Sequence, residues 1–348
     1  MKLRAICKPA SPGQPARSST RSSDQAEQKM PTMELTRRRL IVCALAAGAV
    51  GGVGALIANG DQKPGYVWHG SALGGEARVS LYGSEPETAS RALEAVAQEI
   101  ERLESLFSLH RKTSELSLLN QDQVLSAPSR DLRDLLNAAV DWRSRTGGAF
   151  DPTVQRLWEA AAAGNEPTRE LIETAGSKIS FSDNSISIEA GSALTLNGIA
   201  QGRIADRVTE ILVDHGFHDV VIDTGELRLP GRQPRAVGIP AAKAAVSVAE
   251  VAIATSEPKS LLFDVARWRH HLIDPRTGES PRYWQSISVF APDAQTADAL
   301  STAFAVLPFE AVADLSSSIG DVAVIGRDRK GRIRRFGDLA LTGRRGVS

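Results

Sequence analysis

Asp298 and Thr302 stand four residues apart in the segment Thr296-Ala297-Asp298-Ala299-Leu300-Ser301-Thr302. If this segment is a helix, the carboxylate and the hydroxyl share one face. Both are oxygen ligands of the kind that Mg²⁺ prefers. The competing interpretation is a solvated helical turn, in which the threonine bonds back to the backbone. The spacing alone does not decide between a metal site and this solvated turn.

His271 stands at the end of a strand-like segment that runs into the turn Asp274-Pro275-Arg276-Thr277-Gly278. Pro275 and Gly278 shape such a turn, and the side chain of Asp274 can close it. A histidine at a strand end could serve as a general acid or base near neutral pH. A buried structural histidine remains the alternative.

Two glycine-containing segments could lie near a ligand. Gly198–Gly202 opens a helical pattern, where free N–H groups and the helix dipole attract phosphate. Gly147–Thr153 is most simply a helix end followed by a turn. The sequence lacks a P-loop, a dinucleotide fingerprint after a strand, HExxH and G-x-S-x-G. The common nucleotide-binding and hydrolase classes are therefore excluded.

The elements that must position these residues mix helical and strand patterns in no regular order. Ser84 and Glu87 form a capping-box pattern with Pro86 in the first turn, which predicts a helix start. The apolar residues that follow at helical spacing are Leu93, Val96, Ile100, Leu103 and Phe107. Further helices are expected over residues 129–147, 199–215 and 296–306. Strands are expected over residues 67–81, 178–180 and 185–188 (a hairpin), 220–223, 246–254, 286–290 and 322–325. The mixture favours an α+β fold over a doubly wound sheet.

The chain has 348 residues, 42% hydrophobic and 24% charged, which is a globular composition. Its formal net charge of zero argues against a dedicated nucleic-acid binder. Residues 1–58 hold nine Lys/Arg against three Asp/Glu, so residues 59–348 carry a net charge of −6. Cys7 and Cys43 both lie in the first part. The body therefore has no disulfide, zinc–cysteine site or cysteine nucleophile.

The first 58 residues have the order of an export signal. Residues 1–32 are expected to be disordered, and Met33 is a second possible start. Arg37-Arg38-Arg39 precedes the uncharged, Ala- and Gly-rich segment Leu40–Ala58, which resembles a twin-arginine signal. An inner-membrane anchor is the alternative, since the 19 residues nearly cross a hydrocarbon core of ~30 Å. We expect export to the periplasm, ahead of one domain over residues 59–348.

Seven landmarks, taken in order, resemble the ApbE family of FAD:protein FMN transferases over about residues 66–307. They are Ser114–Asn120, Gly148-Ala149-Phe150-Asp151-Pro152, Gly198-Ile199-Ala200-Gln201-Gly202 with Asp206, Gly225-Glu226, Ala254-Thr255-Ser256, His271–Gly278, and Ala297-Asp298-Ala299-Leu300 with Thr302. The resemblance implies a T-fold-related α+β domain, in which mixed, mainly antiparallel sheets are flanked by helices.

The resemblance also implies a site. Mg²⁺ would be held by the Asp298 carboxylate, the Thr302 hydroxyl and the backbone carbonyl of Gly198. FAD, as substrate, would lie against Leu73, His110, Ala149, Phe150, Asp151, Thr195, Gln201 and Leu272. Such enzymes pass the FMN phosphoryl to a Thr or Ser hydroxyl of a partner protein and release AMP. His271 is the candidate for taking the proton of that hydroxyl.

This chain departs from the family pattern mainly on the flavin side. The family usually has an acid or amide at Thr195, Lys or Glu at Gln201, and Tyr at His110. It has Met-Gly-Thr where this chain has Leu73-Gly74-Gly75, and glycine where this chain has Glu257. An FAD pyrophosphatase and a non-catalytic FAD-binding protein therefore stay open as alternatives.

The partner implied is an acceptor protein with a periplasmic FMN-binding domain. The twin-arginine segment resembles that of flavin transferases that accompany nitrous oxide respiration, whose acceptor is a membrane regulator. Contact with the inner membrane would then be transient or through the signal segment, and no nucleic-acid partner is expected.

Overall fold

The computed structural model describes residues 57–58, 65–83 and 85–337, all within one compact unit, residues 47–348. The residues expected to be disordered, the paired arginines and most of the apolar segment after them lie outside the described residues, as does Ser84. Ile57 and Ala58, placed by the sequence at the end of the export segment, form the short strand β1.

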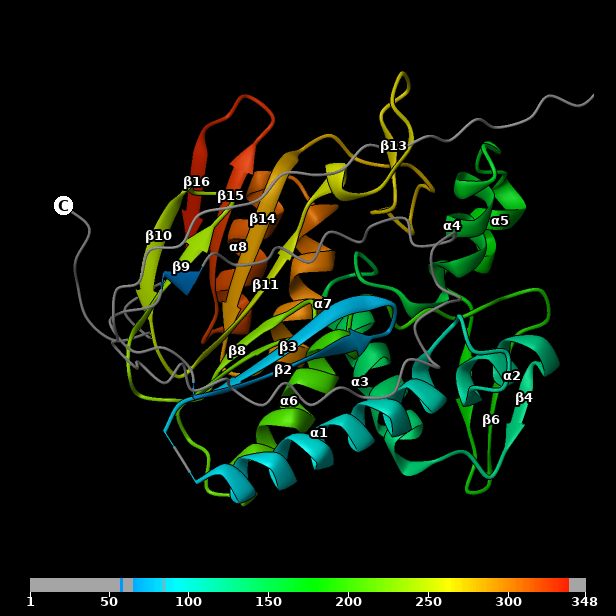
Figure 1. Ribbon diagram of the computed structural model, residues 1–348. Coiled ribbons are helices and arrows are strands. Elements are labelled where there is room, and N and C mark those ends of the chain that lie inside the picture. The colour runs from blue at the N-terminus through cyan, green and yellow to red at the C-terminus, as the bar shows by residue number, and fades with distance from the viewer. Residues whose placement is uncertain (1–56, 59–64, 84, 338–348) are drawn as a thin grey trace, which may run out of the picture. The chain divides into compact units, whose positions relative to one another are not determined.

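An eight-stranded antiparallel sheet forms the centre of the unit (Figure 1). Its strands, in spatial order, are β16 (Ile333–Phe336), β15 (Ala323–Asp328), β14 (Trp284–Ala291), β11 (Val251–Ser256), β8 (Leu227–Leu229), β7 (Val220–Asp223), β3 (Gly75–Leu81) and β2 (Tyr66–Ala72). Helices pack on one face: α1 (Pro86–Phe107), α6 (Ala200–Asp214), α7 (Ala294–Ala305) and α8 (Phe309–Ile319). A small sheet covers part of the other face, in the order β1 (Ile57–Ala58), β9 (Arg235–Ile239) and β10 (Ala244–Val248).

The middle strands of the central sheet are therefore buried on both faces. In β11, Ala252 and Ala254 belong to the core on the helix side. Val251 and Ile253 belong to the core against the small sheet. Because side chains alternate along a strand, one strand contributes to two cores. This explains why β11 reads as a continuous apolar run.

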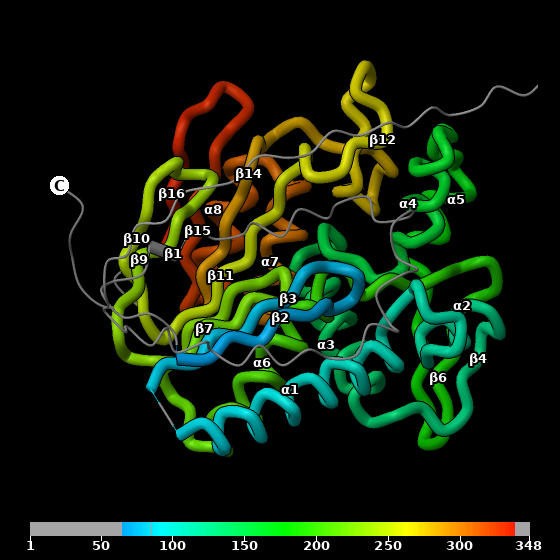
Figure 2. Tube along the Cα trace, viewed as in Figure 1, coloured from blue at the N-terminus to red at the C-terminus, as the bar shows by residue number. Residues whose placement is uncertain are grey.

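Smaller elements surround the sheet and complete the α+β fold. They are α2 (Glu115–Asp122), α3 (Arg130–Arg145), α4 (Gln155–Ala162), α5 (Arg169–Thr174), the 3₁₀ turns η1 (Pro152–Val154) and η2 (Pro258–Ser260), the sheet of β4 (Val124–Ser126), β6 (Ser185–Ile188) and β5 (Ile179–Phe181), and the hairpin β12 (Leu262–Asp264) and β13 (Arg269–His270). The β12–β13 hairpin lies beside α4 and α5 (Figure 2).

The structure confirms the expected helices over residues 129–147, 199–215 and 296–306 and the hairpin of β5 and β6. The first helix begins at Pro86 with Glu85 as its N-cap, and that side chain makes no capping hydrogen bond. The expected single strand over residues 246–254 is wrong. Those residues form β10 and β11 in different sheets, because Glu250 adopts a left-handed backbone (φ 49°) that breaks the strand. No helix of the described ranges is long and apolar enough to span a membrane.

Candidate functional site

The start of α6 meets the start of α7 in an unusually close contact. A Cβ added at Gly202 would lie 2.2 Å from the carbonyl oxygen of Ala294, so only glycine permits this approach. The Asp206 carboxylate accepts hydrogen bonds from the backbone N–H groups of Ala294 and Gln295, each at 2.9 Å. This second cap on α7, beside Asp293, fixes one helix against the other.

Asp298 lies inside this contact. Its side chain is buried, and Oδ2 accepts a hydrogen bond from the backbone N–H of Gly202 at 3.0 Å. Burial raises the pKa of Asp298 to about 7; the Gly202 N–H lowers it and the charge of Asp206 raises it further. The alternative of a solvated helical turn is therefore wrong. Asp298 also joins α6 to α7, so it contributes to packing.

Gly198 and Thr302 lie against each other, and Thr302 follows Asp298 by one turn of α7; these three residues are here called the oxygen cluster. A Cβ added at Gly198 would lie 2.7 Å from Thr302 Oγ1, so the hydroxyl packs on the glycine backbone. Within the described residues, no three His, Cys, Asp or Glu side chains could hold a metal ion by themselves. A cation at this cluster would need the hydroxyl and a backbone carbonyl as well as the carboxylate. An all-oxygen donor set of this kind fits Mg²⁺.

The start of α6 offers few free N–H groups to a phosphate. The N–H of Gly202 is used by Asp298, and the N–H of Ala200 donates to the carbonyl of Leu196 at 2.8 Å. The segment Gly198–Gly202 therefore serves mainly to bring its backbone close to α7.

The predicted flavin-side residues Leu73, His110 and Gln201 come together at the turn between β2 and β3. Leu73 has a left-handed backbone (φ 52°), held by its N–H, which donates to Glu104 Oε1 at 2.8 Å. A Cβ at Gly74 would lie 3.6 Å from the His110 ring, and one at Gly75 would lie 3.0 Å from Gln201 Nε2. Nothing in the sequence pattern distinguishes Glu104 from the other glutamates on α1.

Gln201 also joins this turn to the loop before β8. Its amide would lie within 2.4 Å of a Cβ at Gly225, whose φ is 101°. The Thr224 hydroxyl donates to the Gln201 carbonyl at 3.1 Å. Gln201 therefore contacts both the flavin-side turn and the loop before β8.

Thr195 and the turn Ala149-Phe150-Asp151 form a third group. The Thr195 N–H donates to the carbonyl of Pro152 at 2.7 Å, so the two segments lie side by side. The Asp151 carboxylate accepts from the Thr153 N–H and hydroxyl and lies 3.1 Å from Arg143. Burial raises the pKa of Asp151, and these partners lower it. The carboxylate thus shapes the turn itself.

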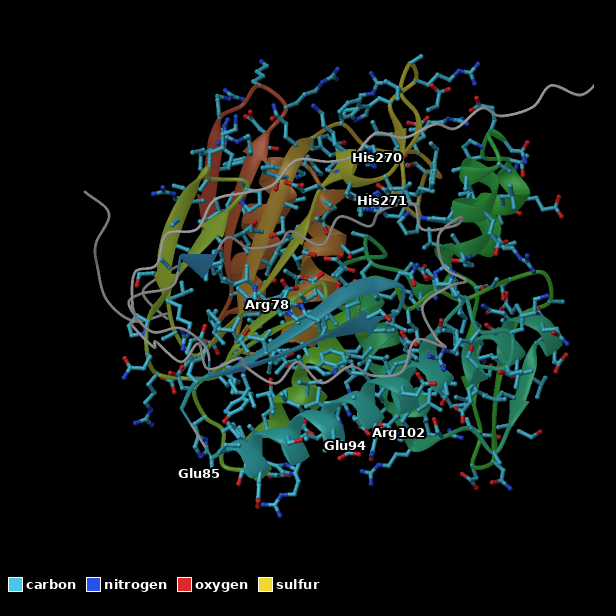
Figure 3. All side chains as sticks on the ribbon, in the orientation of Figure 1. Arg78, Glu85, Glu94, Arg102, His270 and His271 are labelled. Carbon is cyan, nitrogen blue, oxygen red and sulfur yellow. The ribbon has the colours of Figure 1, made fainter. Side chains whose placement is uncertain are left out.

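His271 follows β13 and is half-buried, with His270 wholly buried beside it (Figure 3). Its Nδ1 lies 3.2 Å from the Leu261 carbonyl, so Nδ1–H donates and Nε2 is left with the lone pair. Burial lowers the pKa of His271 to about 4. The side chain is therefore neutral at physiological pH and can accept a proton at Nε2.

The turn after His271 is built as the sequence predicts. Asp274 closes it by accepting a hydrogen bond from the Arg276 N–H at 3.0 Å, and Leu272 is buried. Arg276 also lies against Gly148, since a Cβ there would be 3.7 Å from its side chain. The hydrogen bonds of the described residues do not join His271 to the oxygen cluster.

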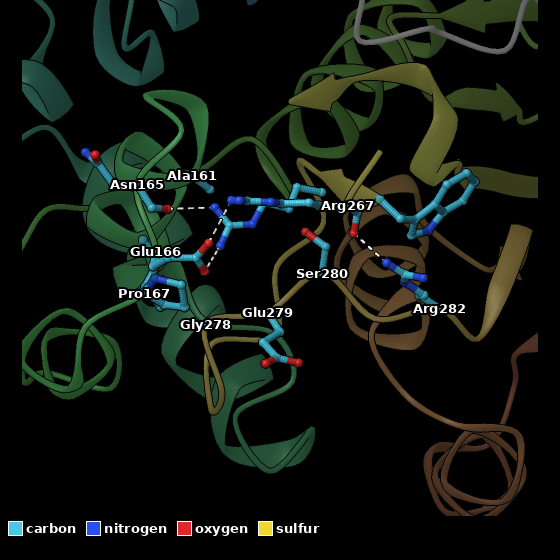
Figure 4. A pocket seen from close by; sticks show the side chains of 12 residues that line it. Ala161, Asn165, Glu166, Pro167, Arg267, Gly278, Glu279, Ser280 and Arg282 are labelled. Atoms are coloured by element: carbon cyan, nitrogen blue, oxygen red, sulfur yellow. Dashed lines mark hydrogen bonds and ion pairs between the residues drawn. The ribbon is translucent and has the colours of Figure 1, made fainter. Parts of the chain in front are cut away.

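A cavity of about 310 Å³ lies between the α4–α5 region and the β12–β13 hairpin (Figure 4). Arg267 and Arg269 both pair with Glu166 there. Ser280, on its wall, donates to the His270 carbonyl at 2.7 Å. None of the predicted site residues lines this cavity, so the oxygen cluster is a separate site.

Comparison with known proteins supports one family. The family model of the ApbE family matches residues 73–325. An FAD:protein FMN transferase of Treponema pallidum is 30% identical over 284 residues, covering 68% of this chain and 77% of that protein. An FAD:protein FMN transferase of Haemophilus influenzae is 28% identical over 259 residues, covering 65% and 75%.

Solved structures show the same fold. The ApbE protein of Thermotoga maritima superposes with a TM-score of 0.69 at 27% identity, covering 80% of this chain and 99% of that one. The flavinyl transferase ApbE of Pseudomonas stutzeri, in its apo form, gives a TM-score of 0.66 at 22% identity, covering 79% and 96%.

Proposed function

This chain belongs to the ApbE family, and from that premise we propose that it is an FAD:protein FMN transferase. It would transfer the FMN part of FAD to a Ser or Thr hydroxyl of an acceptor protein. The bond between the two FAD phosphates breaks and a phosphoester to the acceptor oxygen forms. AMP leaves, and the proton of the hydroxyl is released.

One observation supports this proposal: the oxygen cluster of Gly198, Asp298 and Thr302, in which Asp298 is buried and the other two residues are half-buried. These residues come from two segments far apart in the chain, the turn before α6 and helix α7, and a Cβ at Gly198 would fill the space that the Thr302 hydroxyl takes. We propose that these three residues hold Mg²⁺. The ion would supply positive charge for the pyrophosphate oxygens when bound.

The remaining work falls to side chains of this chain. His271 would take the acceptor proton at Nε2, because the Leu261 carbonyl holds the hydrogen on Nδ1. The turn at Leu73 with His110 and Gln201 would orient the flavin half of FAD. Such catalysis depends mainly on positioning and on charge, as in other phosphoryl transfers.

The test is incubation of the purified protein with FAD and Mg²⁺, with and without an acceptor domain that carries a Ser/Thr-Gly-Ala-Thr motif. Covalent flavin fluorescence on the acceptor is the expected result. AMP formed equally without acceptor would instead indicate an FAD pyrophosphatase. Bound but unchanged FAD would indicate a binding protein and contradict the proposal.

We further propose that the protein acts in the periplasm on an acceptor with a periplasmic FMN-binding domain, after export by the twin-arginine route. Arg37 and Arg38 precede a weakly apolar, Gly-rich segment, which is the pattern of such a signal. By the same resemblance, the acceptor would be the membrane regulator that accompanies nitrous oxide reductase.

Replacing Arg37 and Arg38 with lysine is expected to leave the protein in the cytoplasm, because the charge is kept but the arginine pair is lost. Cell fractionation with an antibody against the folded body measures this. As a matched control, replacing Arg17 and Arg21 with lysine, upstream of the signal pattern, should leave export unchanged. An unaltered periplasmic amount in the Arg37/Arg38 variant would show that the segment is not a twin-arginine signal.

Thr195→Ala and Gln201→Ala are expected to lower transfer less than loss of Asp298. Both positions already depart from the family pattern, and neither residue carries charge. We expect each to raise the KM for FAD about tenfold, the cost of roughly one hydrogen bond. Steady-state kinetics with varied FAD measures this. A loss in both variants as severe as that of an Asp298 variant would contradict the ranking.

A further inference from the structure

A second buried carboxylate faces the helix side of the central sheet. Glu226 directly precedes β8, and the residue is only 8% exposed. Leu227 and Leu229 point to the core against the small sheet. Because side chains alternate along a strand, Glu226 and Arg228 point to the opposite face, where α6 and α7 pack. Arg228 accordingly lies 3.7 Å from Asp206 of α6.

The neighbouring contacts place Glu226 at the oxygen cluster. The loop before it is bonded to the start of α6, where Thr224 donates to the Gln201 carbonyl. The adjacent strand β11 is joined to α7 by the hydroxyls of Ser256 and Ser301, which lie 2.9 Å apart. Glu226 therefore lies between the start of α6 and the turn of α7 that carries the predicted metal ligands.

One oxygen of Glu226 has no partner. Within the described residues, Oε2 is buried and makes no hydrogen bond, while the backbone N–H of Thr255 donates to the carboxylate. The carboxylates of Asp298 and Asp223 are both close enough to Glu226 to act on its charge. No Lys or Arg among the described residues forms an ion pair with Glu226 or with Asp298. Two neighbouring buried carboxylates without a cation are costly, and a divalent ion between them removes that cost.

We propose that Glu226 is a second carboxylate of the magnesium site, and that its unpartnered oxygen directs negative charge toward the cation held by Asp298. This inference rests on the proposed function, which assigns the cation to Gly198, Asp298 and Thr302. It adds a positioning residue from the loop before β8, whereas the other three residues come from the turn before α6 and from α7. Mg²⁺ affinity depends on the number and charge of oxygen ligands, so a second carboxylate would strengthen binding.

The test measures the metal directly. Mn²⁺, a spectroscopic substitute for Mg²⁺, is titrated into the purified full chain, and free Mn²⁺ is followed by electron paramagnetic resonance in the absence of FAD. Glu226→Gln keeps the size of the side chain and removes its charge. We expect it to raise the Kd for Mn²⁺ by about 10- to 100-fold, the usual loss of affinity when a supporting group of a metal site is removed. Mg²⁺ should displace the bound Mn²⁺ from the unaltered protein.

Three further variants make the result specific. Glu226→Asp keeps the charge on a shorter side chain and should bind Mn²⁺ more tightly than Glu226→Gln, even if the latter folds poorly. Glu166→Gln removes one charge from the separate cavity and should leave the Kd unchanged. Asp298→Asn should lose binding. If the unaltered protein and Glu226→Gln bind Mn²⁺ equally while Asp298→Asn does not, the inference about Glu226 is overturned and the proposed function stands. If the unaltered protein binds no Mn²⁺, the magnesium assignment itself fails, and the inference fails with it.

Discussion

Asp298→Asn is expected to abolish FMN transfer, with a loss of roughly 10³-fold or more, in a protein that remains folded. Asparagine keeps an oxygen that can accept the Gly202 N–H, so the contact between α6 and α7 survives. It removes the charge on which an oxygen-only cation site depends. A bound metal ion is typically worth several kcal/mol of transition-state stabilisation, and about 1.4 kcal/mol corresponds to a factor of ten in rate.

Asp298→Ala should show the same loss of transfer and an additional loss of stability, because the buried Gly202 N–H is left without an acceptor. An unsatisfied buried group of this kind costs about 1–3 kcal/mol. Thr302→Val should lose less activity, since water can replace a neutral hydroxyl. The measurements are acceptor flavinylation against Mg²⁺ concentration and thermal melting by circular dichroism. Full transfer by folded Asp298→Asn at ordinary Mg²⁺ would refute the metal assignment.

The second large effect on FMN transfer is expected for His271→Asn. Asparagine can still donate to the Leu261 carbonyl but has no basic nitrogen, so we expect a fall in kcat of about 10²- to 10³-fold with little change in the KM for FAD. His218→Asn changes an exposed histidine at the end of the α6–β7 loop and should leave kcat unchanged. A kcat within a factor of about three of the unaltered protein would remove His271 from the mechanism.

The pH dependence follows from the burial of His271. Its pKa is lowered from 6.5 to about 4, so the neutral, proton-accepting form persists on acidification until the pH approaches 4. With Mg²⁺ saturating at each pH, the decrease in rate caused by protonation of His271 should therefore occur near pH 4, well below 6.5. The same shift affects folding. The unfolded chain takes up this proton first, so His271 makes stability decrease as the pH falls from 6.5 toward 4. A decrease in rate near pH 6.5 that is present in the unaltered protein and absent in His271→Asn would contradict this, because it would show that the side chain is solvated in the active protein.

Much of the fold could be predicted because local patterns and tertiary packing agree there. The first helix buries a stripe of apolar residues such as Val96 and Leu103, which the spacing already indicates. The break between β10 and β11 could not be predicted, because Glu250 gives no local signal for a left-handed backbone. Both halves of that segment are apolar, and only the two separate cores on opposite faces of the sheet distinguish them.

In the candidate site, too, some features could be predicted from the sequence and others could not. The spacing of Asp298 and Thr302 indicated a shared helix face, and the resemblance indicated the partner at Gly198. No pattern indicated that Glu104 holds the backbone of Leu73, because that contact joins a helix to a turn 31 residues earlier in the chain. Likewise, the burial of Asp298 depends on the close approach of α6 and α7 at Gly202. Patterns within one segment of the sequence do not indicate this contact, because it joins two segments that are far apart in the chain.

The hydrogen bond between Gly202 and Asp298 joins residues 96 positions apart, so the oxygen cluster exists only once both helices have packed. A ligand that occupies the cluster then binds the native state alone, and mass action makes that binding part of the folding equilibrium. A free ligand at 100 times its Kd would add about 2.7 kcal/mol to the free energy of unfolding. Under the proposed function, the cytoplasm supplies both FAD and Mg²⁺, and the twin-arginine route carries chains that are already folded. The substrate would therefore favour the export-competent state of the enzyme before any acceptor is met.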